Sequence, residues 1–220
     1  MTNSPGPESA PQTRELPLFP LGVVQFPTMP LDLQIFEPRY LALLDDLGST
    51  GIREFGVVAI RSGHEVGSDN LHRIAEAGCA VRIVDVRPTA SRMLVQARGT
   101  WRFDSIEIID SSKPYAMARV RPLPDDPAPA DHDVDRLRSA LLAYASAAGV
   151  ELHTIPAEPD ELVWWTAAGG PLTLDEQLAI LQASEQERID LLARWLRREA
   201  SLLLNTGSVP FRPDRRAQSN

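Results

Sequence analysis

A stretch rich in proline and aspartate at residues 122–133, PLPDDPAPADHD, divides this sequence into two parts with different hydrophobic patterns. Before it, apolar and β-branched residues occur in short runs that indicate strands. After it, apolar residues recur every three or four positions, as on one face of a helix. Because proline interrupts both helices and central strands, the stretch is expected to be a boundary. The sequence therefore predicts an α+β protein with its strands first and its helices second.

The first part contains several segments with strand patterns and one with a helix pattern. We expect strands at residues 15–27, 31–36, 55–60, 75–87, 93–103 and 115–121, and a helix between Pro38 and Gly48. The clearest alternation of apolar and polar side chains runs through residues 93–103, as on a half-buried antiparallel strand. Its phase changes near Asp104 and Ser105, which requires a bulge or a turn there.

The second part contains four segments with helix patterns, at residues 133–148, 159–168, 174–183 and 185–205. Two of them begin with a capping box, in which a serine or threonine and a glutamate three residues later satisfy free backbone N–H groups. Thr173 pairs in this way with Glu176, and Ser184 with Glu187. We therefore expect a disordered tail at 1–13, a β-rich domain at 14–122, a linker at 123–132, a helical domain at 133–207 and a flexible tail at 208–220.

Composition restricts the class of protein. The 220 residues, 43% of them hydrophobic, are enough to form a real core. The single cysteine, Cys79, excludes a disulfide-built secreted scaffold. The first residues do not resemble a secretory signal, and no apolar run approaches the ~18 residues of a membrane span. The sequence thus predicts a soluble cytoplasmic protein with no membrane partner, and it leaves the oligomeric state open.

The distribution of charge makes nucleic acid an unfavoured partner. The formal net charge is −8, with 13 basic and 13 acidic side chains in residues 14–122, and 6 basic and 15 acidic in residues 123–207. Binding to nucleic acid normally requires a basic excess that neutralises phosphates. An RNA-binding interpretation stays open as an alternative, because four arginines could line one face: Arg82, Arg87, Arg98 and Arg102.

No motif in the sequence predicts catalysis, a metal or a cofactor. The only lysine, Lys113, lies between a serine and a proline, so neither a P-loop nor a Ser–Lys dyad is present. No glycine-rich dinucleotide fingerprint or nucleophile elbow occurs, and the four histidines lack metal-binding spacing. Cys79, in an apolar strand, is expected to be buried and inert. The prediction is a protein that is not an enzyme; the alternative is a small-molecule site, or an uncharacterised enzyme site, between the two halves.

Five segments form a familiar series. They are residues 16–27 (LPLFPLGVVQFP), 31–40 (LDLQIFEPRY), 77–80 (AGCA), 95–103 (VQARGTWRF) and the helical residues 164–204. In this order they resemble the amino-terminal substrate-recognition domain of Lon proteases, and residues 31–40 are most similar to its free-standing bacterial members. The similarity covers about residues 14–205. No ATPase or protease segment follows before Asn220.

The resemblance implies a fold and a function. The fold would be a PUA-like β-barrel with one inserted helix, followed by a C-terminal four-helix bundle segment. The function would be that of a non-catalytic, polypeptide-binding module. Its role would be that of an adaptor in protein quality control. Its partners would be unfolded or degron-bearing polypeptides.

Seven candidate binding residues lie near the expected junction of the two halves. The aromatic ones are Phe36 and Tyr40 at a strand-to-helix corner, Trp101 on the alternating strand, and Trp164 and Trp165 on a helix; Glu37 and Arg39 flank the corner. Exposed aromatics could anchor a client, and the two charged groups could orient it through charge-assisted hydrogen bonds. The contrasting interpretation buries all five aromatics, as is usual for such side chains, and pairs Glu37 and Arg39 with each other or with the backbone.

Overall fold

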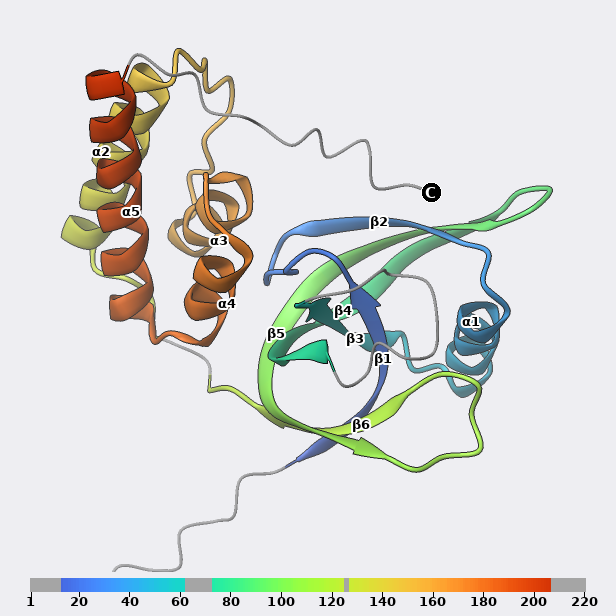
Figure 1. Cartoon of the computed structure of the whole chain (residues 1–220). Coiled ribbons are helices and arrows are strands. Elements are labelled where there is room, and N and C mark those ends of the chain that lie inside the picture. Colours follow the sequence, from blue (N-terminus) through green and yellow to red (C-terminus); the bar gives the residue numbers. More distant parts are fainter. Residues whose placement is uncertain (1–12, 62–72, 125–126, 207–220) are drawn as a thin grey trace, which may run out of the picture.

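The strands come first and the helices second in the computed structural model, which describes residues 13–61, 73–124 and 127–206 (Figure 1). The strands are β1 (Arg14–Leu21), β2 (Pro30–Ile35), β3 (Glu54–Ile60), β4 (Ile74–Pro88), β5 (Met93–Ile109) and β6 (Met117–Pro122). The helices are α1 (Pro38–Thr50), α2 (Asp131–Ala147), α3 (Pro159–Gly169), α4 (Leu174–Gln182) and α5 (Glu185–Thr206). The mixed α+β composition that the sequence predicts is confirmed.

Five of the strands close on themselves, and β2 lies outside the ring. The sheet order is β2-β5-β4-β3-β1-β6, and β5 also pairs with β6. The 17-residue β5 is long enough to pair with two strands in succession: β2 pairs with its first part and β6 with its second. Within the second part the register with β6 shifts between Asp104 and Glu107, and Ser105 has a φ of 51°. The predicted irregularity near Asp104 and Ser105 is therefore confirmed as a bulge in the pairing of β5 with β6.

The first strand and the first helix both differ from prediction at one end. β1 ends at Leu21, so the apolar residues up to Pro27, expected as strand, form a loop instead. α1 continues through Gly48, and Gly51, with a φ of 72°, ends it. A left-handed residue suits the helix end because glycine has no Cβ to clash. The buried residues of α1 are Tyr40, Leu43 and Leu47, which lie three or four positions apart on one side of the helix.

The capping boxes set the starts of α4 and α5 as expected. The Thr173 hydroxyl accepts from the Glu176 N–H, while the Thr173 N–H donates to the Glu176 carboxylate at 2.9 Å. At α5, the Ser184 N–H and hydroxyl donate to the Glu187 carboxylate at 3.2 and 2.8 Å. These local contacts fix the sharp turn between α4 and α5 at Ala183 and Ser184.

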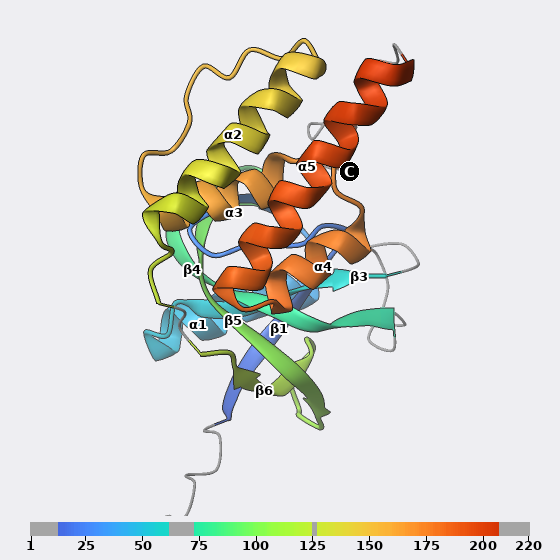
Figure 2. The same cartoon turned by 90° about the vertical axis from the view of Figure 1, so that its left-hand side faces the viewer.

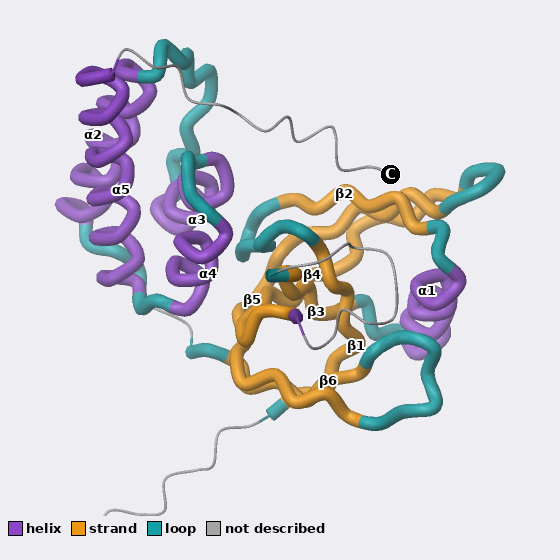
Figure 3. The backbone as a smooth tube through the Cα atoms, viewed as in Figure 1, coloured by secondary structure: helices purple, strands orange, loops and turns teal. Residues whose placement is uncertain are grey.

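The helices and the strands share a hydrophobic cluster. Figure 1 shows α2–α5 on one side of the strand ring and α1 on the other, and Figure 2, turned by 90°, shows α4 close to the strands. Phe26, Met29, Ala77 and Cys79 from the strand half join the core of the helices. Apolar burial therefore continues across the predicted boundary, although residues 123–124 and 127–130, between β6 and α2, form no helix or strand (Figure 3).

Several expectations concern residues that the structure does not describe. The predicted tails lie outside the described residues, apart from Thr13, and so does the loop that carries His64 and His72. The division into a β-rich domain, a linker and a helical domain stays a prediction. Within the described residues, none of the helices combines the length and the apolar character that a membrane crossing needs.

Candidate binding groove

A groove with a volume of about 2560 Å³ runs between the strands and the helices. The strand side contributes residues 19–26, which connect β1 toward β2, and residues 29–34, which include most of β2. The helix side contributes the α2–α3 connection at residues 150–154 and the α3–α4 connection at residues 168–174. Because its walls come from segments far apart in the sequence, the groove depends on the packing of helices against strands.

The loop after β1 is held in place by buried polar contacts. Gln25 is buried, and its Nε2 donates to the backbone oxygens of Phe26 and Met29 at 3.1 and 2.8 Å. Gly99 of β5 lies so close to this loop that a Cβ there would be 2.0 Å from the Phe26 oxygen. The glycine is therefore required for the close approach. This arrangement holds Val23 and Val24, two apolar loop residues, along the groove.

Exposed apolar side chains gather along the groove. Phe36 is 49% exposed, Val23 37% and Leu94 36%, and all three line it. Trp165 also lines it and is half-buried. Opening apolar surface to water costs about 25 cal/mol per Å², so a cluster of such groups in a concave site favours an apolar ligand.

The charged groups of the groove are mainly acidic. Five carboxylates line it, against two guanidinium groups, those of Arg87 and Arg92; the carboxylates are Asp32, Glu37, Asp85, Glu151 and Glu199. Arg87 pairs with Asp85 at 2.6 Å. Among the described residues, Asp32 accepts a hydrogen bond from Gln96 at 3.3 Å and forms no ion pair. The groove is therefore suited to a ligand that is both apolar and basic.

Four of the seven predicted binding residues line this groove, and they differ in exposure. Phe36, Glu37, Tyr40 and Trp165 are the four. Tyr40 is only 5% exposed, and its ring stacks on Phe19 with 4.1 Å between the ring centroids. Burial raises the pKa of the Tyr40 hydroxyl to about 12. Tyr40 therefore supports the groove wall as part of the core, whereas Phe36 presents free apolar surface.

Glu37 and Arg39 pair with each other, as the contrasting interpretation expects. Arg39 Nε donates to Glu37 Oε2 at 3.0 Å, and Arg39 Nη2 lies 2.9 Å from the same oxygen. The Arg39 guanidinium also lies 4.5 Å from the centroid of the Tyr40 ring. Arg39 does not line the groove. The pair thus stabilises the start of α1, and Glu37 also lines the groove.

Trp101 and Trp164 lie away from the groove. Trp101 meets Phe103 edge to face at 5.8 Å, and the Arg14 guanidinium lies 4.8 Å from its ring centroid. Trp164 is 6% exposed and stacks on Phe26 at 5.7 Å. The Arg188 guanidinium lies 4.0 Å from the Trp164 ring centroid. For Trp164 the core interpretation therefore describes the structure, and its neighbour Trp165 is the tryptophan that reaches the groove.

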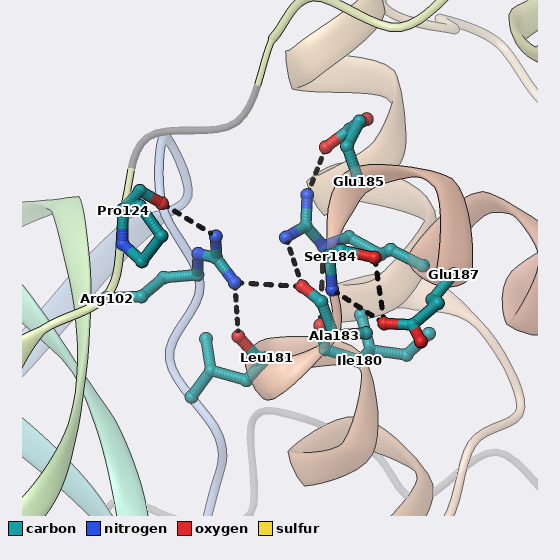
Figure 4. A network of polar contacts seen from close by, with 9 residues as sticks. Arg102, Pro124, Ile180, Leu181, Ala183, Ser184, Glu185 and Glu187 are labelled. Carbon is teal, nitrogen blue, oxygen red and sulfur yellow. Dashed lines mark hydrogen bonds and ion pairs between the residues drawn. The ribbon is translucent and has the colours of Figure 1, made fainter. Parts of the chain in front are cut away.

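Two buried arginines donate to carbonyl groups at the end of α4, and one of them, Arg102, comes from the strands (Figure 4). Arg102 of β5 donates to the backbone oxygens of Leu181 and Ala183, at 2.8 and 3.0 Å, and to that of Pro124 at 3.2 Å. Arg188 of α5 donates to the Ala183 oxygen at 2.8 Å and contacts Glu185. The last carbonyl groups of a helix lack partners within the helix, so both arginines satisfy the end of α4.

The position of Arg102 corrects the expected arginine face. Arg102 is 7% exposed beneath the helices and cannot contribute to a nucleic-acid surface. Arg82 bonds to Glu54 at 2.7 Å and Arg87 to Asp85 at 2.6 Å, which neutralises two of the remaining three. The reason for the error is that β5 passes under α4, so its polar face is buried at this point.

Cys79 is fully buried, and burial raises the pKa of its thiol to about 12. A thiol with this pKa stays protonated from pH 7 to pH 9, and only the thiolate attacks thiol reagents. We therefore expect native protein to react on the order of a thousandfold more slowly than urea-unfolded protein, since reaction requires unfolding. Absorbance kinetics with a disulfide reagent measure both rates. Rapid native labelling that accelerates between pH 7 and pH 9 would contradict this placement.

No group of three metal-ligating side chains occurs within residues 13–61, 73–124 and 127–206.

The groove residues that the sequence interpretation did not predict include Val23, Leu94 and the loop at residues 150–154. Val23 carried a usable signal, because an apolar run interrupted by Pro17, Pro20 and Gly22 is a poor continuous strand. Leu94 carried none, since one exposed leucine on an edge-facing strand is ordinary.

Comparison with known proteins shows similarity across the described strands and helices. The profile of the ATP-dependent protease La (LON) substrate-binding domain matches residues 15–198. Lon protease 1 of Herpetosiphon aurantiacus is 24% identical over an aligned length of 206 residues, and the alignment covers 86% of this chain and 25% of the relative. This chain thus spans about a quarter of that relative's length.

Two solved structures have a similar fold, each with a TM-score of 0.61 and each covering 83% of this chain and 98% of the other. One is the crystal structure of a Lon N-terminal domain protein from Xanthomonas campestris, which is 27% identical. The other is the N-terminal domain of the Mycobacterium avium complex Lon protease, which is 14% identical and shows the fold alone.

Proposed function

This chain belongs to the Lon substrate-binding domain family, and from that premise we propose that it binds polypeptide segments in the groove between its strands and its helices. The observation that carries the proposal is Phe36, a large aromatic side chain that is 49% exposed in a concave site. Val23 and Leu94 extend this apolar surface. Aromatic anchors in such sites commonly supply most of the binding energy for a protein partner.

The finer parts of the proposal concern the clients and the cellular role. We propose unfolded or degron-bearing segments as the clients, because such segments expose the apolar residues that folded proteins bury. The role would be non-catalytic recognition, as an adaptor in protein quality control. The PUA-like classification of the closed sheet and the bundle arrangement of α2–α5 belong to the same proposal, and the cytoplasmic location stays a prediction from the sequence.

Replacing Phe36 with alanine tests the groove directly. The expected result is at least about tenfold weaker binding of reduced and alkylated ribonuclease A, a permanently unfolded basic protein, since an anchor of this kind contributes 1.4 kcal/mol or more. The free energy of unfolding should change by no more than about 0.5 kcal/mol, because the side chain is half-exposed. Fluorescence anisotropy gives the affinity and urea titration gives the stability.

Ile52→Ala provides the matched control. Ile52 is 58% exposed, follows α1, and does not line the groove. Its replacement removes a similar exposed apolar group from a different surface, so the affinity for alkylated ribonuclease A should stay within about twofold. Equal losses for Ile52→Ala and Phe36→Ala would show nonspecific adhesion and refute the groove as the binding site.

A further inference from the structure

The strand β2 is an open edge of the sheet. It ends the strand order, and among the described residues its only ladder partner is β5. An unpaired edge presents a row of backbone N–H and C=O groups that can accept another strand. The other five strands close into a ring, in which each strand pairs with a neighbour on both sides.

The register identifies which backbone groups of β2 point outward. Gly99 N–H donates to the Met29 oxygen at 3.0 Å, so Met29 and Gly99 are an opposed pair in which the Met29 carbonyl points to β5, while the Gly99 oxygen accepts from the Thr28 N–H. In an antiparallel ladder such pairs alternate, so Leu31, Leu33 and Ile35 direct their backbone groups to β5. Asp32 and Gln34 then direct their N–H and C=O groups to the free edge. Pro30, which has no N–H to offer β5, falls in the outward set, as this phase requires.

The strand β2 lies at the rim of the strand half (Figures 1 and 3), and it borders the groove. Five consecutive residues, Pro30 to Gln34, line the groove. Successive side chains on a strand point to opposite faces, so a surface that touches every residue in turn touches the edge of the strand rather than one face. Backbone hydrogen-bonding groups and exposed apolar groups such as Phe36 therefore share one site.

The two faces of this edge differ in chemistry. On the buried face, Leu31 and Ile35 belong to the core and Leu33 is half-buried. On the outer face, Asp32 and Gln34 are exposed, and Asp32 forms no ion pair within the described residues. An added strand would place alternate side chains beside these two rows. Apolar client residues suit the buried row. Basic client residues suit the outer row, because Asp32 and the other carboxylates of the groove attract positive charge.

We propose that an extended polypeptide segment with alternating apolar and basic residues binds by adding to β2 as a further strand. This proposal rests on the proposed polypeptide-binding function of the groove and specifies its geometry. β2 has six residues, so the paired part of the client would be about five or six residues long. Main-chain hydrogen bonds supply affinity for many sequences, and the alternation supplies the preference.

The pair Gln34→Pro and Gln34→Ala tests the outward N–H of β2. Both replacements remove the side chain that accepts a hydrogen bond from Arg92, but only proline removes the N–H and obstructs an approaching strand. Proline is tolerated on an edge strand at a position whose backbone nitrogen faces solvent, so both variants should fold. The probe is a fluorescein-labelled peptide of about ten residues in which arginine alternates with valine or phenylalanine. We expect Gln34→Pro to bind the peptide at least about tenfold more weakly than Gln34→Ala, which retains the N–H.

A second measurement leaves the protein unchanged. The same peptide is methylated on one backbone nitrogen at a time, and its affinity for the wild-type protein is measured. Strand addition predicts that affinity falls at every second amide and is retained at the amides between, because only alternate amides face β2. This test stands even if Gln34→Pro destabilises the protein.

The outcomes separate this proposal from the function on which it rests. Equal losses at all amides, or no loss at any, overturn strand addition, and so does equal affinity of Gln34→Pro and Gln34→Ala. If these results occur while Phe36→Ala still weakens binding of alkylated ribonuclease A, the groove binds polypeptide by side-chain contacts alone. If neither probe binds the wild-type protein, the proposed function itself fails.

Discussion

Replacing Arg102 with alanine should lower the free energy of unfolding by about 3–4 kcal/mol, one of the largest effects expected from a single substitution in this chain. Its guanidinium donates to three backbone oxygens from two separate segments, those of Pro124, Leu181 and Ala183. Removing it leaves the carbonyl groups at the end of α4 buried with fewer donors, and each unsatisfied group costs about 1–3 kcal/mol. Urea titration of the two proteins measures the difference.

Arg98→Ala and Arg102→Lys are the controls for this prediction. Arg98 lies on the same strand but is exposed, and it donates to a single backbone oxygen, that of Thr28, at 2.9 Å. Its loss should cost no more than about 1 kcal/mol. Lysine at position 102 keeps the positive charge but cannot span three carbonyl groups, so it should restore only part of the stability. A full rescue by lysine would mean that charge, rather than the fork geometry, matters at this position.

The features that were predictable from the sequence are those that nearby residues determine. Thr173 accepts from the N–H of Glu176, and Glu187 accepts from the N–H of Ser184, so contacts within three positions mark the starts of α4 and α5 in the sequence. The change of phase at Ser105 was also visible, because a strand that bends must interrupt its alternation. The family resemblance, now supported by a match over residues 15–198, depended on the order of such local segments.

The features that were not predictable depend on which segments pack together. The alternation in β5 assigns Arg102 to a polar face, which would be exposed on an isolated sheet. The structure buries that face under α4, and the same packing creates the groove. Phe36 shows the reverse effect, since a large aromatic side chain is usually buried and this one is 49% exposed in the groove. Sequence periodicity assigns side chains to faces, but only tertiary packing determines which faces meet water.

Trp164 and Trp165 provide the strongest internal contrast, because neighbours in sequence are expected to have different roles. Trp164→Ala should cost about 3–5 kcal/mol, since the ring is buried against Phe26 and beneath the Arg188 guanidinium. It should also remove the cation–π contact that stabilises this buried arginine. Trp165→Ala should cost only about 1 kcal/mol, because the side chain is half-buried.

Binding separates the two tryptophans in the opposite direction. Trp165 lines the groove, so Trp165→Ala should weaken binding of alkylated ribonuclease A by about tenfold. Binding is measured in buffer without urea, at a temperature where the protein is fully folded. Trp164→Phe, which keeps an aromatic ring against Phe26, should bind the same probe within about twofold of wild type. Adjacent helical residues point about 100° apart, which is why one ring can complete the core while the next reaches the ligand. Weaker binding by Trp164→Phe together with unchanged binding by Trp165→Ala would reverse this assignment and place the site on the other face of α3.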